Sequence, residues 1–286
     1  MEFIDSQVIQ KDINIKRKQK TNRRAIKVDI LYFFILILCM LFLLVLLLPV
    51  LRLITVNNIN NFLRTLNNQS NLLSIKLSIL TTLISTTIVY VFCTPITFFF
   101  IFHKNKLIKN VIDILTTIPT ILPPAIAGIG LMLTFNRNSF FGIILNYFNI
   151  QIEFSTIAVI IAQVFVSSGL YIQVIKSAIQ KIDKEVFEIS YVLGANKSVI
   201  FIKIVLPIIK YSVVNGLILS AARSLGEFGA TLMFAGNIEG ITRTIPLQIM
   251  TLMQSDIYAA YSLSGFVLVF TILILAIIKH TSRGDV

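Results

Sequence analysis

Tryptophan is absent from this 286-residue chain, and cysteine and histidine occur only twice each. Cys39 and Cys93 both lie inside apolar segments, so we interpret them as packing residues and predict neither a disulfide framework nor a metal site. His103 and His280 lie in basic clusters at the ends of apolar segments. Because no nucleophile is paired with a base in the sequence, the chain is not predicted to be an enzyme.

Charge is scarce as well: only 13% of the residues are charged, against about 25% in soluble domains. The formal net charge is +12, but the basic residues lie at the ends of apolar runs rather than between exposed aromatic residues. This placement is typical of membrane orientation and argues against nucleic acid as a partner. A GxxxxGK[ST] phosphate loop is missing, so the chain cannot hold ATP by that route and no bound cofactor is expected.

Apolar runs of about 20 residues recur along the chain, which is 56% hydrophobic with a mean hydropathy of +0.87. A helix needs this length to cross a bilayer, so the sequence predicts an all-α integral membrane protein. The third run contains Pro119, Pro123 and Pro124 and is not expected to be straight. Asp113, near its inner end, is expected to balance the charge of Lys109 and the basic turn before it, with a proton relay as the alternative. Six transmembrane helices are predicted, at about 30–51, 75–102, 111–135, 155–179, 206–234 and 258–278.

The distribution of basic residues predicts the orientation in the membrane. With the N-terminus in the cytosol, the inner segments hold 19 of the 25 Lys and Arg: eight in the tail, three in 104–109, six from Lys176 to Lys210, and Lys279 and Arg283. This asymmetry places both termini, and the connection between the fourth and fifth spans, on the cytosolic side. The chain then divides into a basic cytosolic tail (1–29), a first span with an external loop (30–69), a transport domain (70–279) and a cytosolic C-terminal tail (280–286). An organellar targeting peptide is the alternative for the tail.

A polar stretch at 183–207 separates the fourth and fifth spans. Asp183 is a predicted N-cap, and an apolar face of Val186, Ile189 and Leu193 follows at helical spacing. Gly194 stands where a helix would end in a left-handed cap, and a second helical start follows at Ser198. The sequence thus predicts a helix, a glycine turn and a second helix at the membrane surface.

This stretch resembles the cytoplasmic coupling motif of ATP-binding-cassette (ABC) importer permeases, which runs Glu-Ala-Ala, three residues, Gly, nine residues, Ile, one residue and Leu-Pro. The matching positions are Glu188, Gly194, Ile204, Leu206 and Pro207. Two alanines of the motif are replaced here, by isoleucine and serine at 189 and 190. The resemblance implies that a cytosolic ATPase receives a coupling helix at about 183–198. The alternative is an amphipathic linker between two membrane helices.

The fifth span carries an ion-pair candidate and small residues. Arg223 and Glu227 are one helical turn apart, and a pair buried in the membrane can lock helices together or gate a path. With Gly226 and Gly229 they form the predicted gate or pore group. Small residues at four-residue spacing favour close helix packing, either within the chain or against a second copy. The two stripes are Ser212, Gly216, Ser220 and Ser224, and Ala222, Gly226 and Ala230.

The run Leu-Gly-Glu-Phe-Gly at 225–229, followed by Ala-Gly-Asn at 235–237, resembles the permeases of the sulfate and molybdate import class. The run Ile-Leu-Pro-Pro at 121–124 resembles the same class. The resemblance covers about residues 70–278 and implies the membrane subunit of an importer for a tetrahedral oxyanion. Sulfate or thiosulfate is the favoured anion and molybdate the second candidate. The resemblance leaves open whether the membrane is a bacterial inner membrane or a plastid membrane.

The partners that this resemblance implies are a second permease (identical or related), two cytosolic ATPase subunits that use the ATP, an external oxyanion-binding protein, and membrane lipid. The alternative function is an ATP-independent secondary carrier or channel. Such carriers typically contain broken helices in two corresponding halves. The sequence clearly predicts only one broken span, the third.

Overall fold

The computed structural model describes residues 32–56, 64–65 and 67–282, so the predicted tail 1–29 lies outside the described residues. The chain divides into two units, 1–56 and 57–286. The described part of the first unit is one apolar helix, Tyr32–Thr55, which agrees with the predicted first span.

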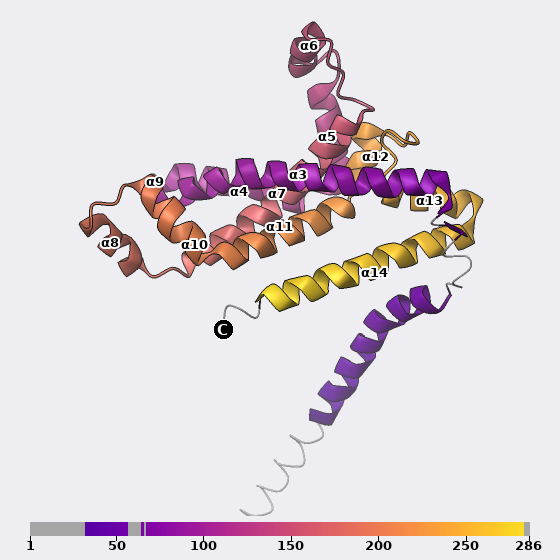
Figure 1. Cartoon of the computed structure of the whole chain (residues 1–286), viewed down its shortest axis with the longest axis horizontal. Helices are drawn as coiled ribbons and strands as arrows, with labels where there is room; N and C mark the ends of the chain where they lie inside the picture. Colours follow the sequence, from indigo (N-terminus) through magenta and orange to yellow (C-terminus); the bar gives the residue numbers. More distant parts are fainter. Residues whose placement is uncertain (1–31, 57–63, 66, 283–286) are drawn as a thin grey trace, which may run out of the picture. The chain divides into compact units, whose positions relative to one another are not determined.

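Every regular element in the described part of the second unit is helical, as the sequence predicts. Three helices, α3, α7 and α11, pack on one another, and Figure 1 shows them running lengthwise side by side. The helices are α3 (Gln69–Phe102), α4 (Lys106–Ile121), α5 (Pro124–Phe135), α6 (Phe140–Tyr147), α7 (Thr156–Gln180), α8 (Lys184–Val192), α9 (Lys197–Val199), the π-helical turn η1 (Ile200–Val205), α10 (Leu206–Ile208), α11 (Lys210–Leu225), α12 (Gly229–Ala235), α13 (Ile245–Ser255) and α14 (Ile257–Ser282).

Three described helices are long and apolar enough to cross a membrane: Tyr32–Thr55, α3 and α7. The number rises to five if each of two bent helix pairs counts as one span. In α14, the apolar stretch among the residues whose side chains are described, Ile257–Leu273, is shorter. The six-span topology therefore stays a prediction.

The third predicted span is broken, as its prolines predict. Its two halves, α4 and α5, meet at an angle of 115°. Leu122 and Pro123 have extended backbone angles between the helices, and a residue that precedes proline disfavours the helical conformation. Figure 1 shows α5 leaving the direction of α4 steeply.

The prediction of one helix over 206–234 is wrong. The segments before and after Ile209 meet at 75°, because this residue has a ψ of 13° and leaves the helical conformation. The helix then ends at Leu225, and α12 starts separately at Gly229. The expectation of a single broken span is wrong as well, because the fifth is also bent.

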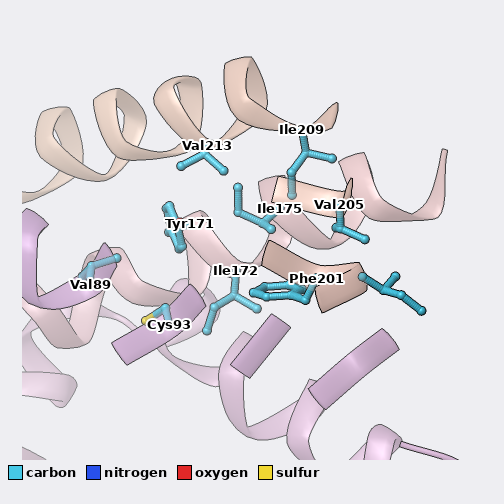
Figure 2. Packing of buried hydrophobic residues seen from close by; sticks show 10 residues of the cluster. Val89, Cys93, Tyr171, Ile172, Ile175, Phe201, Val205, Ile209 and Val213 are labelled. Atoms are coloured by element: carbon cyan, nitrogen blue, oxygen red, sulfur yellow. The ribbon is translucent and has the colours of Figure 1, made fainter. Parts of the chain in front are cut away.

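The main hydrophobic core joins the polar stretch to the long helices. Figure 2 shows Tyr171, Ile172 and Ile175 of α7 near side chains of α3, η1 and α11. Ile200 and Val205 of η1 are fully buried in this cluster. The turn that follows α8 is therefore fixed to the bundle by apolar packing. A second cluster joins α5, α7 and α12.

Candidate coupling segment and gate

The predicted helix and glycine turn are present at 183–194. Helix α8 begins after Asp183, although the aspartate side chain makes no capping hydrogen bond. Gly194 has a φ of +82°, the left-handed region that glycine enters without steric cost. The N–H of Ala195 donates to the Ser190 carbonyl at 3.0 Å, and the N–H of Gly194 donates to the Tyr191 carbonyl at 3.0 Å. These two bonds make a Schellman motif, so the helix ends where the sequence predicts.

The second helical segment, α9, begins at Lys197, one residue before the predicted Ser198. The Asn196 side chain accepts a hydrogen bond from the N–H of Val199 at 2.9 Å and caps the short helix α9. A π-helical turn follows, in which the Leu206 N–H donates to the Phe201 carbonyl five residues earlier. Pro207, the last residue of the motif, has no N–H to contribute, and a widened turn before a proline relieves the clash of its ring with the preceding backbone.

Two of the five motif residues pack against the core, and the other three are exposed. Ile204 and Leu206 are half-buried and pack against the main core. Glu188, Gly194 and Pro207 are exposed. The ring of Phe201 packs edge-on against Phe98 of α3, with centroids 5.3 Å apart and planes at 88°. This arrangement positions α8 on a fixed base, which a loose linker would not have.

The apolar face predicted for α8 is not the side that is buried in the structure. Phe187 is half-buried against the core and Ser190 is buried, so this side faces the bundle. The helix and its C-cap also expose apolar side chains, which we call the α8 patch. It consists of Ile189, Tyr191, Val192 and Leu193, which are 59%, 47%, 87% and 80% exposed. Contiguous exposed apolar surface marks a site of interaction.

Arg223 and Glu227 form the predicted ion pair, with 3.3 Å between Nη1 and Oε2. They do not share one helix, because Glu227 lies beyond the end of α11. Its other carboxylate oxygen, Oε1, accepts a hydrogen bond from the N–H of Ala230 at 2.8 Å. It thereby provides an acceptor for a backbone N–H in the first turn of α12. The Glu227 side chain is fully buried, whereas that of Arg223 is 35% exposed. The pair therefore bridges α11 and α12 across the break.

The two predicted glycines at this break have different surroundings. A Cβ on Gly229 would lie 3.0 Å from Cβ of Pro124 and 3.1 Å from the Ala125 nitrogen, so glycine lets α12 approach the start of α5. A Cβ on Gly226 would lie 3.6 Å from the Ala222 carbonyl oxygen, which is an ordinary contact distance. Close packing therefore needs glycine at 229, and not at 226.

Helix α5 gives a matched test of this close approach. Gly128→Ala is expected to lower stability by about 1–3 kcal/mol, because the new Cβ would lie 2.7 Å from the Ala230 carbonyl oxygen and 2.8 Å from its Cα. Backbone atoms of a packed helix cannot move aside easily. Gly130→Ala is the control, because no atom lies within 4 Å of its added Cβ. Thermal unfolding of both variants in detergent measures the difference, and equal melting temperatures would contradict the packing argument.

The small residues of α11 pack within the chain. A Cβ on Gly216 would lie 3.1 Å from the Tyr171 ring of α7, and Ser220 and Ser224 are fully buried. At these positions the stripe therefore serves the packing of α11 inside the bundle.

The prediction of the charge partner of Asp113 is wrong. Its carboxylate pairs with Lys176 of α7 rather than with Lys109, which lies on its own helix. The Lys176 ammonium also lies 5.3 Å from the centroid of the Phe100 ring. Sequence reasoning missed this link between α4 and α7 because the partners are 63 residues apart. The available signal was two opposite charges near the inner ends of predicted spans.

The described residues contain no group of three or more His, Cys, Asp or Glu that could hold a metal ion.

Comparison with known proteins places these features in a family. Residues 93–283 match the family model of the binding-protein-dependent transport system inner membrane component. The probable transport system permease protein NifC of Clostridium pasteurianum is 45% identical over 237 residues, covering 83% of each chain. The molybdenum transport system permease protein ModB of Mycobacterium tuberculosis is 34% identical over 70% of this chain and 76% of its own length. The probable sulfate transport system permease protein cysT of Helicosporidium is 32% identical over 58% of this chain and 60% of its own.

Solved structures support the same fold at lower identity. A bacterial ABC transporter that imports alginate superposes with a TM-score of 0.74 and 16% identity, covering 92% of this chain and 98% of that one. A bacterial alginate ABC transporter in complex with an alginate pentasaccharide-bound periplasmic protein gives a TM-score of 0.71 at 15% identity, covering 89% and 94%. The extent of the family match, together with the identity to these relatives, shows that the chain belongs to the inner-membrane components of binding-protein-dependent transport systems, an ABC permease family.

Proposed function

We propose that this chain is the permease subunit of an ABC importer and carries a tetrahedral oxyanion, with molybdate and sulfate as the candidates. The observation that carries the coupling role is the α8 patch, an exposed apolar surface on a helix whose base is buried in the core. The substrate class rests on the relatives named as molybdenum and sulfate permeases. The choice between the two anions stays open.

The proposed assembly contains two such permeases, two cytosolic ATPase subunits and an external binding protein. Each ATPase would receive one α8 patch, and hydrolysis would take place in the ATPase rather than in this chain. The six-span topology, with both termini on the ATPase side, belongs to the proposal. The second permease is either an identical chain or a relative.

The geometry supports a rigid-body mechanism. A force on α8 passes through η1, whose buried residues contact α3 and α7, and reaches α11 across the bend at Ile209. At its far end α11 carries Arg223, which is tied to α12 through Glu227. Closure of the ATPase pair would thus be transmitted to the Arg223–Glu227 pair, because packed helices move as units.

Transport in proteoliposomes tests this proposal. The permease, its partner ATPase and its binding protein are reconstituted with radioactive molybdate or sulfate outside. Uptake of one anion is expected with ATP and at background level with a non-hydrolysable ATP analogue. An ATPase inactivated in its catalytic base provides the control.

The uptake results test the permease role and the substrate class separately. Uptake that continues without hydrolysis would favour the ATP-independent carrier and contradict the permease role. ATP-driven uptake of neither anion, but of another solute, would retain the permease role and remove the substrate class. Competition with unlabelled tungstate and thiosulfate then ranks the oxyanions.

A further inference from the structure

A groove of about 640 Å³ lies between the end of α7 and the start of α11. Its polar lining consists of Gln173, Ser177, Lys181 and Ser212. Ile208 and Ile209, at the 75° bend, line it as well. A water molecule occupies about 30 Å³ in the liquid, so the groove has room for a small solute that keeps part of its hydration shell.

The lining offers hydrogen-bond donors and lacks a carboxylate. Among the described residues, the Lys181 ammonium forms none of the ion pairs, and neither the Ser177 nor the Ser212 hydroxyl forms a side-chain hydrogen bond. The Gln173 amide donates one long bond, 3.4 Å, to the Thr120 hydroxyl and has a second N–H for another acceptor. Asp183, two residues from Lys181, does not line the groove.

We propose that this groove binds a tetrahedral oxyanion, held by Lys181, Ser177, Ser212 and Gln173. An anion with four oxygen acceptors fits an ammonium, two hydroxyls and an amide, because each can direct an N–H or O–H at a different oxygen. The bound anion would bridge α7 and α11 across the bend. This site rests on the proposed function, and it would bind the transported anion on the cytosolic side of the permease.

The simpler interpretation of Lys181 is local. It stands at the C-cap of α7, where a positive charge stabilises the carbonyl end of a helix. That role requires neither the serines nor a ligand. The capping role and the anion site therefore make different predictions. Only the anion site requires that anion affinity depend on Lys181, Ser177 and Ser212.

Equilibrium binding of radioactive molybdate and sulfate tests the proposal. The complete permease–ATPase complex, without the binding protein, is placed in phosphatidylcholine nanodiscs, which contain no anionic headgroup. Saturable binding of at least one anion is expected. Lys181→Gln should weaken it about tenfold, because the substitution removes a charge-assisted hydrogen bond to the anion. Ser177→Ala combined with Ser212→Ala should weaken it several-fold.

Lys210→Gln is the matched control. It removes the same charge from the start of α11, two residues from Ser212, and the Lys210 side chain does not line the groove. It is expected to change affinity less than twofold. Absence of saturable binding, or equal affinity in wild type and Lys181→Gln, would overturn the groove site. ATP-driven uptake by the same preparations, with the binding protein added, distinguishes a failure of the groove site from a failure of the proposed function. Uptake without binding in the groove would contradict the groove site alone. Lys181-dependent binding without uptake would support the site and remove the transport role.

Discussion

Arg223→Met is expected to destabilise the protein more than Glu227→Gln, although the two residues form one ion pair. The Glu227 carboxylate is fully buried, whereas the Arg223 side chain is 35% exposed. Removing the arginine leaves a buried charge without its partner, which typically costs about 3–5 kcal/mol. Glutamine at 227 keeps an oxygen for the Ala230 N–H and leaves a partly solvated arginine, so about 1 kcal/mol is expected. Thermal unfolding of the purified variants measures the order.

The same pair of variants separates a structural lock from a gate. If the pair only joins α11 to α12, Glu227→Gln should transport within about twofold of wild type per folded complex. We expect instead that ATP hydrolysis continues while uptake falls about tenfold, a loss of about 1.4 kcal/mol in the transport step. Arg223→Lys, which retains the charge, provides the control. Normal uptake by Glu227→Gln would assign the pair to packing alone.

Local sequence signals predicted the features that depend on neighbouring residues. The turn at Gly194 was predictable because glycine enters the left-handed conformation without strain and the residues before it have helical spacing. The break in the third span was predictable because prolines cannot donate an N–H to a continuing helix. The Arg223–Glu227 contact was predictable from its four-residue spacing, although the helix that it was assigned to ends at Leu225.

Features that depend on tertiary packing were missed. The bend at Ile209 lies in an apolar run, and hydropathy does not distinguish one straight helix from two short ones. The buried side of α8 is set by its contact with the bundle, so helical spacing alone did not show that Ile189 and Leu193 are exposed. The Asp113–Lys176 pair joins two helices that only the fold brings together.

Val192→Asp and Leu193→Asp should each abolish ATP-driven uptake while leaving the fold intact. Their side chains are 87% and 80% exposed, so little intramolecular burial is lost. At a docked interface, each substitution removes about 1.5–3 kcal/mol of apolar burial and adds the cost of desolvating a carboxylate. Together these effects weaken docking at least about a hundredfold. The measurements are co-purification of the ATPase, uptake in proteoliposomes, and the melting temperature of the permease.

Asn105→Asp is the matched control for this experiment. It adds the same negative charge on the predicted cytosolic side, at a residue whose side-chain oxygen already caps α4 through the Leu107 N–H, and aspartate caps equally well. We expect normal melting, co-purification and uptake from the control, and loss of the last two alone from the α8 variants. Co-purification of the ATPase with Val192→Asp at the wild-type level would show that the patch does not receive the ATPase. The patch would then need another occupant, because the chain itself covers little of these two side chains.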